Sequence, residues 1–117
     1  MRIKLLPLDI LFSKYIRMKA DGNCEYCGAW KTLQCSHFHG RRKRSVRYDE
    51  DNACGLCFSC HMYLGENPFQ HTEFFKKRLG TDRFEKLNIR AEMTHPKPDT
   101  EKIALELKEK IKAMESE

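Results

Sequence analysis

This 117-residue sequence has no apolar run that approaches the roughly 20 residues of a membrane-spanning helix. Its first seven residues, Met1 to Pro7, lack the long apolar segment and the small-residue cleavage site of a secretory signal. It also contains no internal repeat that would indicate a solenoid or another repeated architecture. These absences predict an intracellular protein with one globular domain and no membrane partner.

The composition predicts a small core and a basic surface. Apolar residues make up 40% of the chain, the formal net charge is +5 and the pI is about 8.9. The charge is uneven, because residues 99–117 carry six acidic and four basic side chains while residues 1–98 carry a net charge of +7. The positive surface therefore belongs to the main domain, and polyanions are plausible partners for it.

Four of the six cysteines form two C-x-x-C pairs, Cys24 with Cys27 and Cys57 with Cys60. In an intracellular chain this spacing favours a metal site over disulfides. Four thiolates are a complete tetrahedral ligand set for Zn²⁺, with no position left for a substrate, so the expected zinc is structural. The other two cysteines, Cys35 and Cys54, are expected to be small buried apolar side chains.

Local patterns predict helices around a short stretch of strand. A helix capped by Asp9 is expected to run to about Ala20, with Ile10, Leu11, Tyr15 and Met18 on its inner side. The alternation from Leu33 to Phe38 predicts one strand, and Val46 to Tyr48 is the expected returning strand.

The second half of the chain reads as a series of helices. One is expected to start near Cys57 or Cys60 and to end at about Leu64, and another follows the capping signal Asn67-Pro68 and ends at Gly80. Thr81 and Asp82 are the expected cap of a third. The predicted core residues of these helices are Phe74, Phe75, Leu79, Phe84 and Leu87.

The chain divides into a domain over residues 1–98 and a C-terminal amphipathic helix over residues 99–117. The linker His95-Pro-Lys-Pro98 is stiff, and Asp99 or Thr100 is expected to cap the helix. The apolar stripe of the helix consists of Ile103, Leu107, Ile111 and Met114. It predicts packing on a protein partner, on a second copy in a homodimer, or across the helix's own domain.

Polar residues lie between and beside the two cysteine pairs. The motifs Ser36-His37-Phe38, Asp51-Asn52 and Cys57-Phe-Ser-Cys60-His61 resemble those of the HNH endonucleases, which have a ββα-metal fold. Within that superfamily the chain is most similar to phage-encoded proteins, including the NinG-like recombination nucleases. The resemblance covers about residues 20–90. It implies an α+β fold with a small zinc-stapled ββα-metal core and flanking helices.

The resemblance also implies roles for individual residues. His37 matches the general base, Asn52 matches the asparagine that holds the loop and orients that base, and His61 matches a ligand of a catalytic divalent cation. This cation would be Mg²⁺, Mn²⁺, Ni²⁺ or Zn²⁺. Many members have Asp or His where this chain has Ser36, which is a poor direct ligand. His71 is a candidate to complete the site and His39 a weaker one, although each also fits a structural or surface position.

A run of basic residues lies between the predicted strand and the loop that holds Asn52. In that place it is better read as a contact with DNA phosphates than as a solvated face. Nothing in the chain has the pattern of a helix that reads bases, so sequence-specific recognition is not expected. The predicted DNA-binding residues are Arg41, Arg42, Lys43, Arg44 and Arg47.

Together these features predict a metal-dependent DNA endonuclease encoded by a phage or a mobile element. It would act in the cytoplasm of a bacterial or phage-infected cell. Two alternatives remain open at this point. One is a junction- or branch-specific recombination nuclease, and the other is a non-catalytic, zinc-stabilised module that binds nucleic acid.

Overall fold

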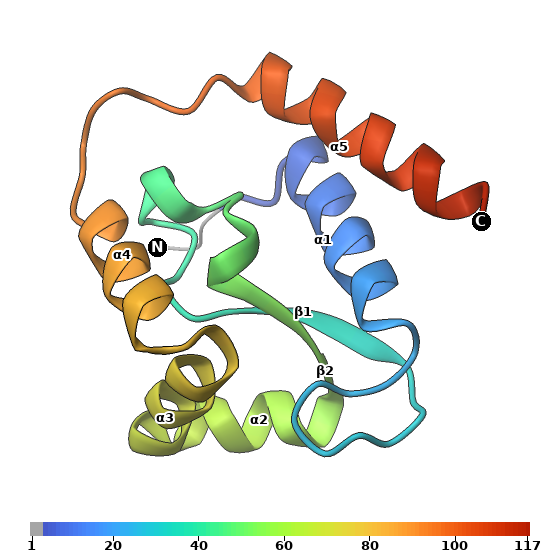
Figure 1. The fold of residues 1–117 in the computed structure, drawn as a ribbon, viewed down its shortest axis with the longest axis vertical. Helices are drawn as coiled ribbons and strands as arrows, with labels where there is room; N and C mark the ends of the chain where they lie inside the picture. The colour runs from blue at the N-terminus through green and yellow to red at the C-terminus, as the bar shows by residue number, and fades with distance from the viewer. Residues whose placement is uncertain (1–3) are drawn as a thin grey trace.

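The computed structural model describes residues 4–117 and has an antiparallel two-stranded sheet surrounded by helices (Figure 1). The predicted α+β fold class is therefore confirmed. In the described residues, no helix is long and apolar enough to cross a membrane. The helices are α1 (Pro7–Ala20), α2 (Phe58–Glu66), α3 (Pro68–Leu79), α4 (Thr81–Ala91) and α5 (Thr100–Glu115).

The sheet consists of β1 (Leu33–His37) and β2 (Ala53–Cys57), with Leu33 opposite Cys57 and His37 opposite Ala53. Every residue of β2 is buried, and α2 begins at the next residue of the chain. The predicted returning strand at Val46 to Tyr48 is wrong. That segment contains a short 3-10 helix, η1 (Arg44–Val46), and the buried Val46 anchors it in the core. Val46 thus packs into the core from a connecting segment and does not belong to a β-strand.

Helix α1 starts at Pro7. Proline suits this position because a backbone N–H in the first turn would have no acceptor within the helix. The sequence predicts Asp9 as the helix cap, but the N-cap residue is Leu6 and Asp9 is the third residue of the helix. Its carboxylate instead accepts a hydrogen bond from the backbone N–H of Leu6 at 2.7 Å. The predicted inward face is correct in part, because Tyr15 is buried and Leu11 and Met18 pack partly buried against the same core cluster. The structure adds the buried Phe12 and Ile16 to this face, whereas Ile10 is 60% exposed.

Helix α3 has the bounds that the sequence indicates, and α4 follows it directly after Gly80, which has a positive φ of 83°. Phe75, Leu79, Phe84 and Leu87 are buried between these helices and the hairpin, as predicted, and Phe74 is partly buried. Asn67 and Pro68 take the predicted N-cap and first helical positions of α3, but the Asn67 side chain makes no cap hydrogen bond. The Asn67 side chain donates to the Tyr63 carbonyl of α2 instead, at 2.7 Å. Thr81 is the first residue of α4 and not its predicted cap.

Helix α5 lies across its own domain, alongside α1 (Figure 1). Asp99 caps it as expected, because its carboxylate accepts the backbone N–H of Lys102 at 3.1 Å. Leu107 and Ile111 are each 4% exposed in a core cluster shared with α1. The apolar stripe is thus covered by the chain itself. A second cluster lies among the hairpin and α2, α3 and α4. The hairpin therefore packs against α1 in one cluster and against α2, α3 and α4 in the other.

Candidate functional site

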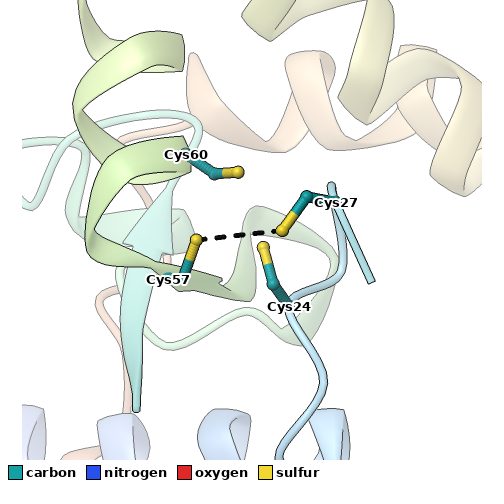
Figure 2. Close-up of side chains that lie close together, drawn as sticks. All are labelled: Cys24, Cys27, Cys57 and Cys60. Carbon is teal, nitrogen blue, oxygen red and sulfur yellow. Dashed lines mark hydrogen bonds between the residues drawn. The ribbon is translucent and has the colours of Figure 1, made fainter. Parts of the chain in front are cut away.

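Four thiols converge where a tight turn meets the junction of β2 and α2 (Figure 2). Cys24 and Cys27 come from a turn closed by the Gly28 N–H, which donates to the Cys24 carbonyl at 2.8 Å. Gly28 takes a positive φ of 78°, which favours glycine. Cys57 ends β2, and Cys60 lies in the first turn of α2. The four sulfur atoms all lie within 4.8 Å of one another.

This arrangement fits a tetrahedral metal ion. Sulfurs bound to zinc at about 2.3 Å stand about 3.8 Å apart in a tetrahedron, and the Sγ atoms of Cys27 and Cys57 are 3.9 Å apart. All four donors are thiols, the ligand type that zinc prefers at structural sites. The cluster can therefore hold a structural metal ion such as zinc, and the residues are the four that the sequence predicts.

Hydrogen bonds prepare two of the thiols for deprotonation. A hydrogen bond with the Ser59 hydroxyl, aided by the backbone N–H of Cys60, lowers the pKa of Cys57 to about 6. Burial raises the pKa of the Cys24 thiol, but hydrogen bonds from the backbone around Cys27, Cys57 and Tyr26 outweigh it and leave that pKa lowered. The thiolate is the form that binds metal, so these two residues favour binding.

The remaining cysteines lie outside this cluster. Cys54 is fully buried in the core, and Cys35 is partly buried on β1. Burial raises the pKa of the Cys35 thiol to about 12 and that of Cys54 further. Both therefore stay protonated and behave as the small apolar side chains that the sequence predicts.

His37 lies at the end of β1, with its ring fixed on two sides. Its Nε2 is 3.1 Å from the main-chain carbonyl oxygen of Arg47. A carbonyl only accepts hydrogen bonds, so in the neutral ring Nε2 carries the proton and Nδ1 has the lone pair, with no hydrogen-bond partner among residues 4–117. The Phe12 ring of α1 packs against the imidazole with a centroid distance of 5.7 Å. Burial lowers the pKa of His37, which keeps the ring neutral at neutral pH.

A cavity of about 350 Å³ lies at the β1 edge of the hairpin and brings His37 and His61 together. His61 reaches it from the first half of α2, directly after the last cysteine of the metal cluster. Ser36 is buried and pairs with Cys54 across the sheet. The residues that line the cavity are Gln34, Cys35, His37, Gly40, Arg41 and His61.

Asn52 is fully buried and holds the long connection between the strands. Its Oδ1 accepts the backbone N–H of His39 at 2.8 Å. Its Nδ2 donates to the carbonyls of His39 at 2.9 Å and Val46 at 3.0 Å. One side chain thus fixes two points of the loop that carries the Arg47 carbonyl, and through that loop it supports the position of His37.

Two imidazole nitrogens stand out among the described residues because they are buried without a hydrogen-bond partner. They are Nδ1 of His61 and Nε2 of His71, on α2 and α3. Burial and the nearby His61 ring lower the pKa of His71, so the ring is neutral and its nitrogen can bind a cation. A buried polar atom without a partner calls for an explanation such as an ion. His39 differs, because its Nε2 pairs with the Asn88 side chain at 2.8 Å.

The basic run divides into inward and outward parts. Arg47 is only 11% exposed at its side chain and forms a two-pronged ion pair with Asp9, and Arg41 lies 3.7 Å from the same carboxylate. Lys43 pairs with Glu92 at 3.1 Å in an exposed position. Arg42 and Arg44 are exposed on the loop. The Arg47 side chain is thus engaged by Asp9, whereas Arg42, Lys43 and Arg44 are exposed.

Sequence reasoning missed Asp9 and Phe12 of α1 as neighbours of the site. The sequence predicts Asp9 only as a helix cap, and its predicted inner face does not contain Phe12. The Asp9–Arg47 pair joins residues 38 positions apart. A single acidic residue in a first helical turn carries no signal of such a distant partner.

A family model described as "Bacteriophage Lambda NinG protein" matches residues 7–117. Searches of curated proteins and of solved structures found no significant match. The family match supports the predicted phage origin and the similarity to NinG-like proteins, while membership of the HNH superfamily stays a prediction. Because the match covers nearly the whole chain, the protein belongs to the bacteriophage lambda NinG family.

Proposed function

We propose that this protein is a metal-dependent DNA endonuclease of the HNH type. The observation that carries the proposal is the state of His37. Its Nε2 is held by the Arg47 carbonyl, its Nδ1 lone pair has no partner in the part of the chain that the structure describes, and it shares a cavity with His61. A neutral imidazole held in one tautomer beside an open cavity is suited to accept a proton from water.

The order of elements supports the same proposal. Strand β1, a long connection, β2 and α2 follow one another, and α2 starts directly after β2. The thiol cluster ties the turn before β1 to the β2–α2 junction. This is the arrangement that the resemblance to ββα-metal nucleases implies, with the predicted base on the strand and the predicted metal ligand on the helix.

His61 and His71 would hold the catalytic cation. Their partnerless buried nitrogens fit this role, and His71 takes the place of the usual ligand at Ser36. Two imidazoles favour Mn²⁺, Ni²⁺ or Zn²⁺ over Mg²⁺, which prefers oxygen ligands. When bound, such a cation stabilises the negative charge that develops on the phosphate and the leaving oxygen.

The chain's own residues supply the remaining functions. His37 Nδ1 accepts the proton of the attacking water. Asn52 holds the loop in place, and the Arg41 guanidinium on the cavity wall brings positive charge to the phosphate. The products would carry 5′-phosphate and 3′-hydroxyl ends, as the resemblance implies.

The outward basic side chains would contact the DNA backbone. Arg42, Lys43 and Arg44 are exposed on the loop beside the cavity, in a domain of net positive charge. Contacts of this kind release counterions from DNA, so affinity should fall steeply as salt rises.

Two further functions remain alternatives to this proposal. A junction- or branch-specific recombination nuclease would use the same centre and would prefer branched DNA over linear duplex. A non-catalytic zinc module would bind DNA through the same basic loop and would cleave none. Ser36 in place of the usual ligand is the feature that favours the module.

Plasmid cleavage tests the proposal. The purified protein is incubated with supercoiled plasmid and Mg²⁺, Mn²⁺, Ni²⁺ or Zn²⁺ in turn, with EDTA as the control. We expect nicked or linear product with at least one of these ions. DNA binding without cleavage under all of these conditions would support the module instead. A parallel assay on branched and linear duplexes separates the two nuclease functions.

A further inference from the structure

Asp9 is a buried carboxylate that holds Arg47 with two hydrogen bonds. It is 3% exposed, and its Oδ1 and Oδ2 accept from Nε and Nη2 of Arg47 at 2.9 and 2.6 Å. The backbone N–H of Leu6 donates to the same carboxylate at 2.7 Å. Burial opposes ionisation of Asp9, but these hydrogen bonds and the nearby guanidinium groups leave its pKa lowered. The pair is therefore charged and rigid at neutral pH.

The residue that Asp9 holds is also the one that fixes His37. The Arg47 guanidinium is anchored to α1, and it also donates to the Lys4 carbonyl at 3.0 Å. The main-chain carbonyl of Arg47 accepts from His37 Nε2 at 3.1 Å. Holding the side chain fixes the peptide group that orients the imidazole. Asp9 and His37 are thus connected through a single residue.

Helix α1 supports the ring at a second point. Phe12 lies one turn after Asp9, and its ring packs on the His37 imidazole and on Tyr48. One face of one helix thus holds the hydrogen-bond acceptor of His37 through Asp9 and contacts the ring through Phe12. None of these contacts involves a cysteine of the thiol cluster.

We propose that Asp9 is a positioning residue for His37, acting through Arg47. It keeps the Arg47 carbonyl where it selects the Nε2-protonated tautomer and directs Nδ1 into the cavity. The inference rests on the proposed nuclease function for its effect on rate. Its effect on the tautomer of His37 can be measured in the free protein without any activity.

The competing explanation is an ion pair that only stabilises the fold. Glu25 offers a matched control, because its carboxylate also holds an arginine and a backbone N–H. It accepts from Arg78 Nε at 3.0 Å and from the Gly55 N–H at 2.5 Å, on the thiol-cluster side of the molecule. Glu25→Gln removes a similar set of contacts and leaves the neighbours of His37 unchanged.

The experiment compares the wild type with Asp9→Asn, Arg47→Lys and Glu25→Gln. The ¹⁵N spectra of the imidazoles are recorded at mildly alkaline pH, where histidine is neutral, and the His37 signals are assigned with His37→Gln. Zinc content and circular dichroism check folding. Plasmid cleavage with Mn²⁺ gives kcat and KM for each variant.

We expect His37 to be protonated at Nε2 in the wild type and in Glu25→Gln. Asp9→Asn should give a mixture of tautomers and a kcat about 10- to 100-fold lower with an unchanged KM, since small misplacement of a reacting group costs this much. Arg47→Lys keeps the charge but loses the two-pronged contact, so it should show a smaller shift in the same direction. If Asp9→Asn does not fold, the same measurements on Arg47→Lys test the inference.

The inference would be overturned if Asp9→Asn showed a single Nε2-protonated tautomer and a wild-type kcat. If only Arg47→Lys folds, the same result in that variant would overturn it. Equal loss in Glu25→Gln would overturn it as well, because general destabilisation would then explain the effect. A wild type that cleaves no DNA would contradict the nuclease proposal alone, and the tautomer would still decide the role of Asp9.

Discussion

Replacing Cys57 with serine should unfold the region around the hairpin. The Cys57 thiol is buried at the point where β2 passes into α2, and its cluster ties this junction to the turn at Cys24 and Cys27. Structural zinc contributes about 10–16 kcal/mol in small peptides. The net stability of a whole domain is about 5–15 kcal/mol. If removal of one ligand releases the zinc, the fold therefore loses a contribution as large as its whole stability.

The assay combines native mass spectrometry for bound zinc with circular dichroism for helix content. We expect about one zinc per wild-type chain, and Cys57→Ser should lose both the zinc and a cooperative unfolding transition. Cys35→Ser is the matched control, since Cys35 lies on the partner strand opposite Gly55 and outside the cluster. It should keep its zinc. A wild-type protein that is fully folded and free of zinc would refute the reasoning.

Three further predictions concern the supports of the site. Leu107→Ala should cost about 2–5 kcal/mol in unfolding free energy, because it leaves a cavity over α1, while zinc content stays unchanged; a change below about 0.5 kcal/mol in denaturant titration would mean that α5 does not cover α1. Asn52→Ala leaves buried groups of the loop unpaired, so it should cost at least about 1–3 kcal/mol and should lower cleavage less than loss of His37 does; unchanged thermal unfolding would contradict this. Because the pKa of Asp9 is lowered from 3.8 in the folded state, its stabilisation is present above that pH and is lost as the pH falls through the folded pKa. The difference in unfolding free energy between wild type and Asp9→Asn should thus be about 3–5 kcal/mol near neutral pH and should shrink below about pH 4; a difference independent of pH would exclude this ionisation as the cause.

The sequence predicts well those features that depend on spacing along the chain. The two C-x-x-C pairs identify the thiol cluster because each pair places two sulfurs on one side of a short turn. Glycine and proline mark the bounds of α3, and the start of α5 follows from its cap. The position of His61 early in α2 follows from its place after Cys60.

Features that depend on contacts between distant segments were not predictable in the same way. Val46 and Tyr48 are β-branched and aromatic residues with the local preference of a strand. In the structure Val46 instead ends a short 3-10 helix, with its side chain buried in the core. The basic run is uniform in sequence, yet Asp9 draws Arg41 and Arg47 inward and leaves Arg42 and Arg44 exposed. The apolar stripe of α5 was equally compatible with a partner and with α1, because a stripe does not identify what covers it.

Cleavage by His37→Ala tests the central claim most directly. General-base catalysis contributes about 10²–10⁴-fold, so this variant should lose at least about two orders of magnitude in plasmid cleavage rate. It should keep its zinc and its affinity for DNA, because His37 is neither a thiol ligand nor an outward basic residue. His61→Ala should also lose cleavage, with weaker binding of the second cation and no release of zinc. A His37→Ala protein that is free of contaminating nuclease and cleaves at the wild-type rate would contradict the account.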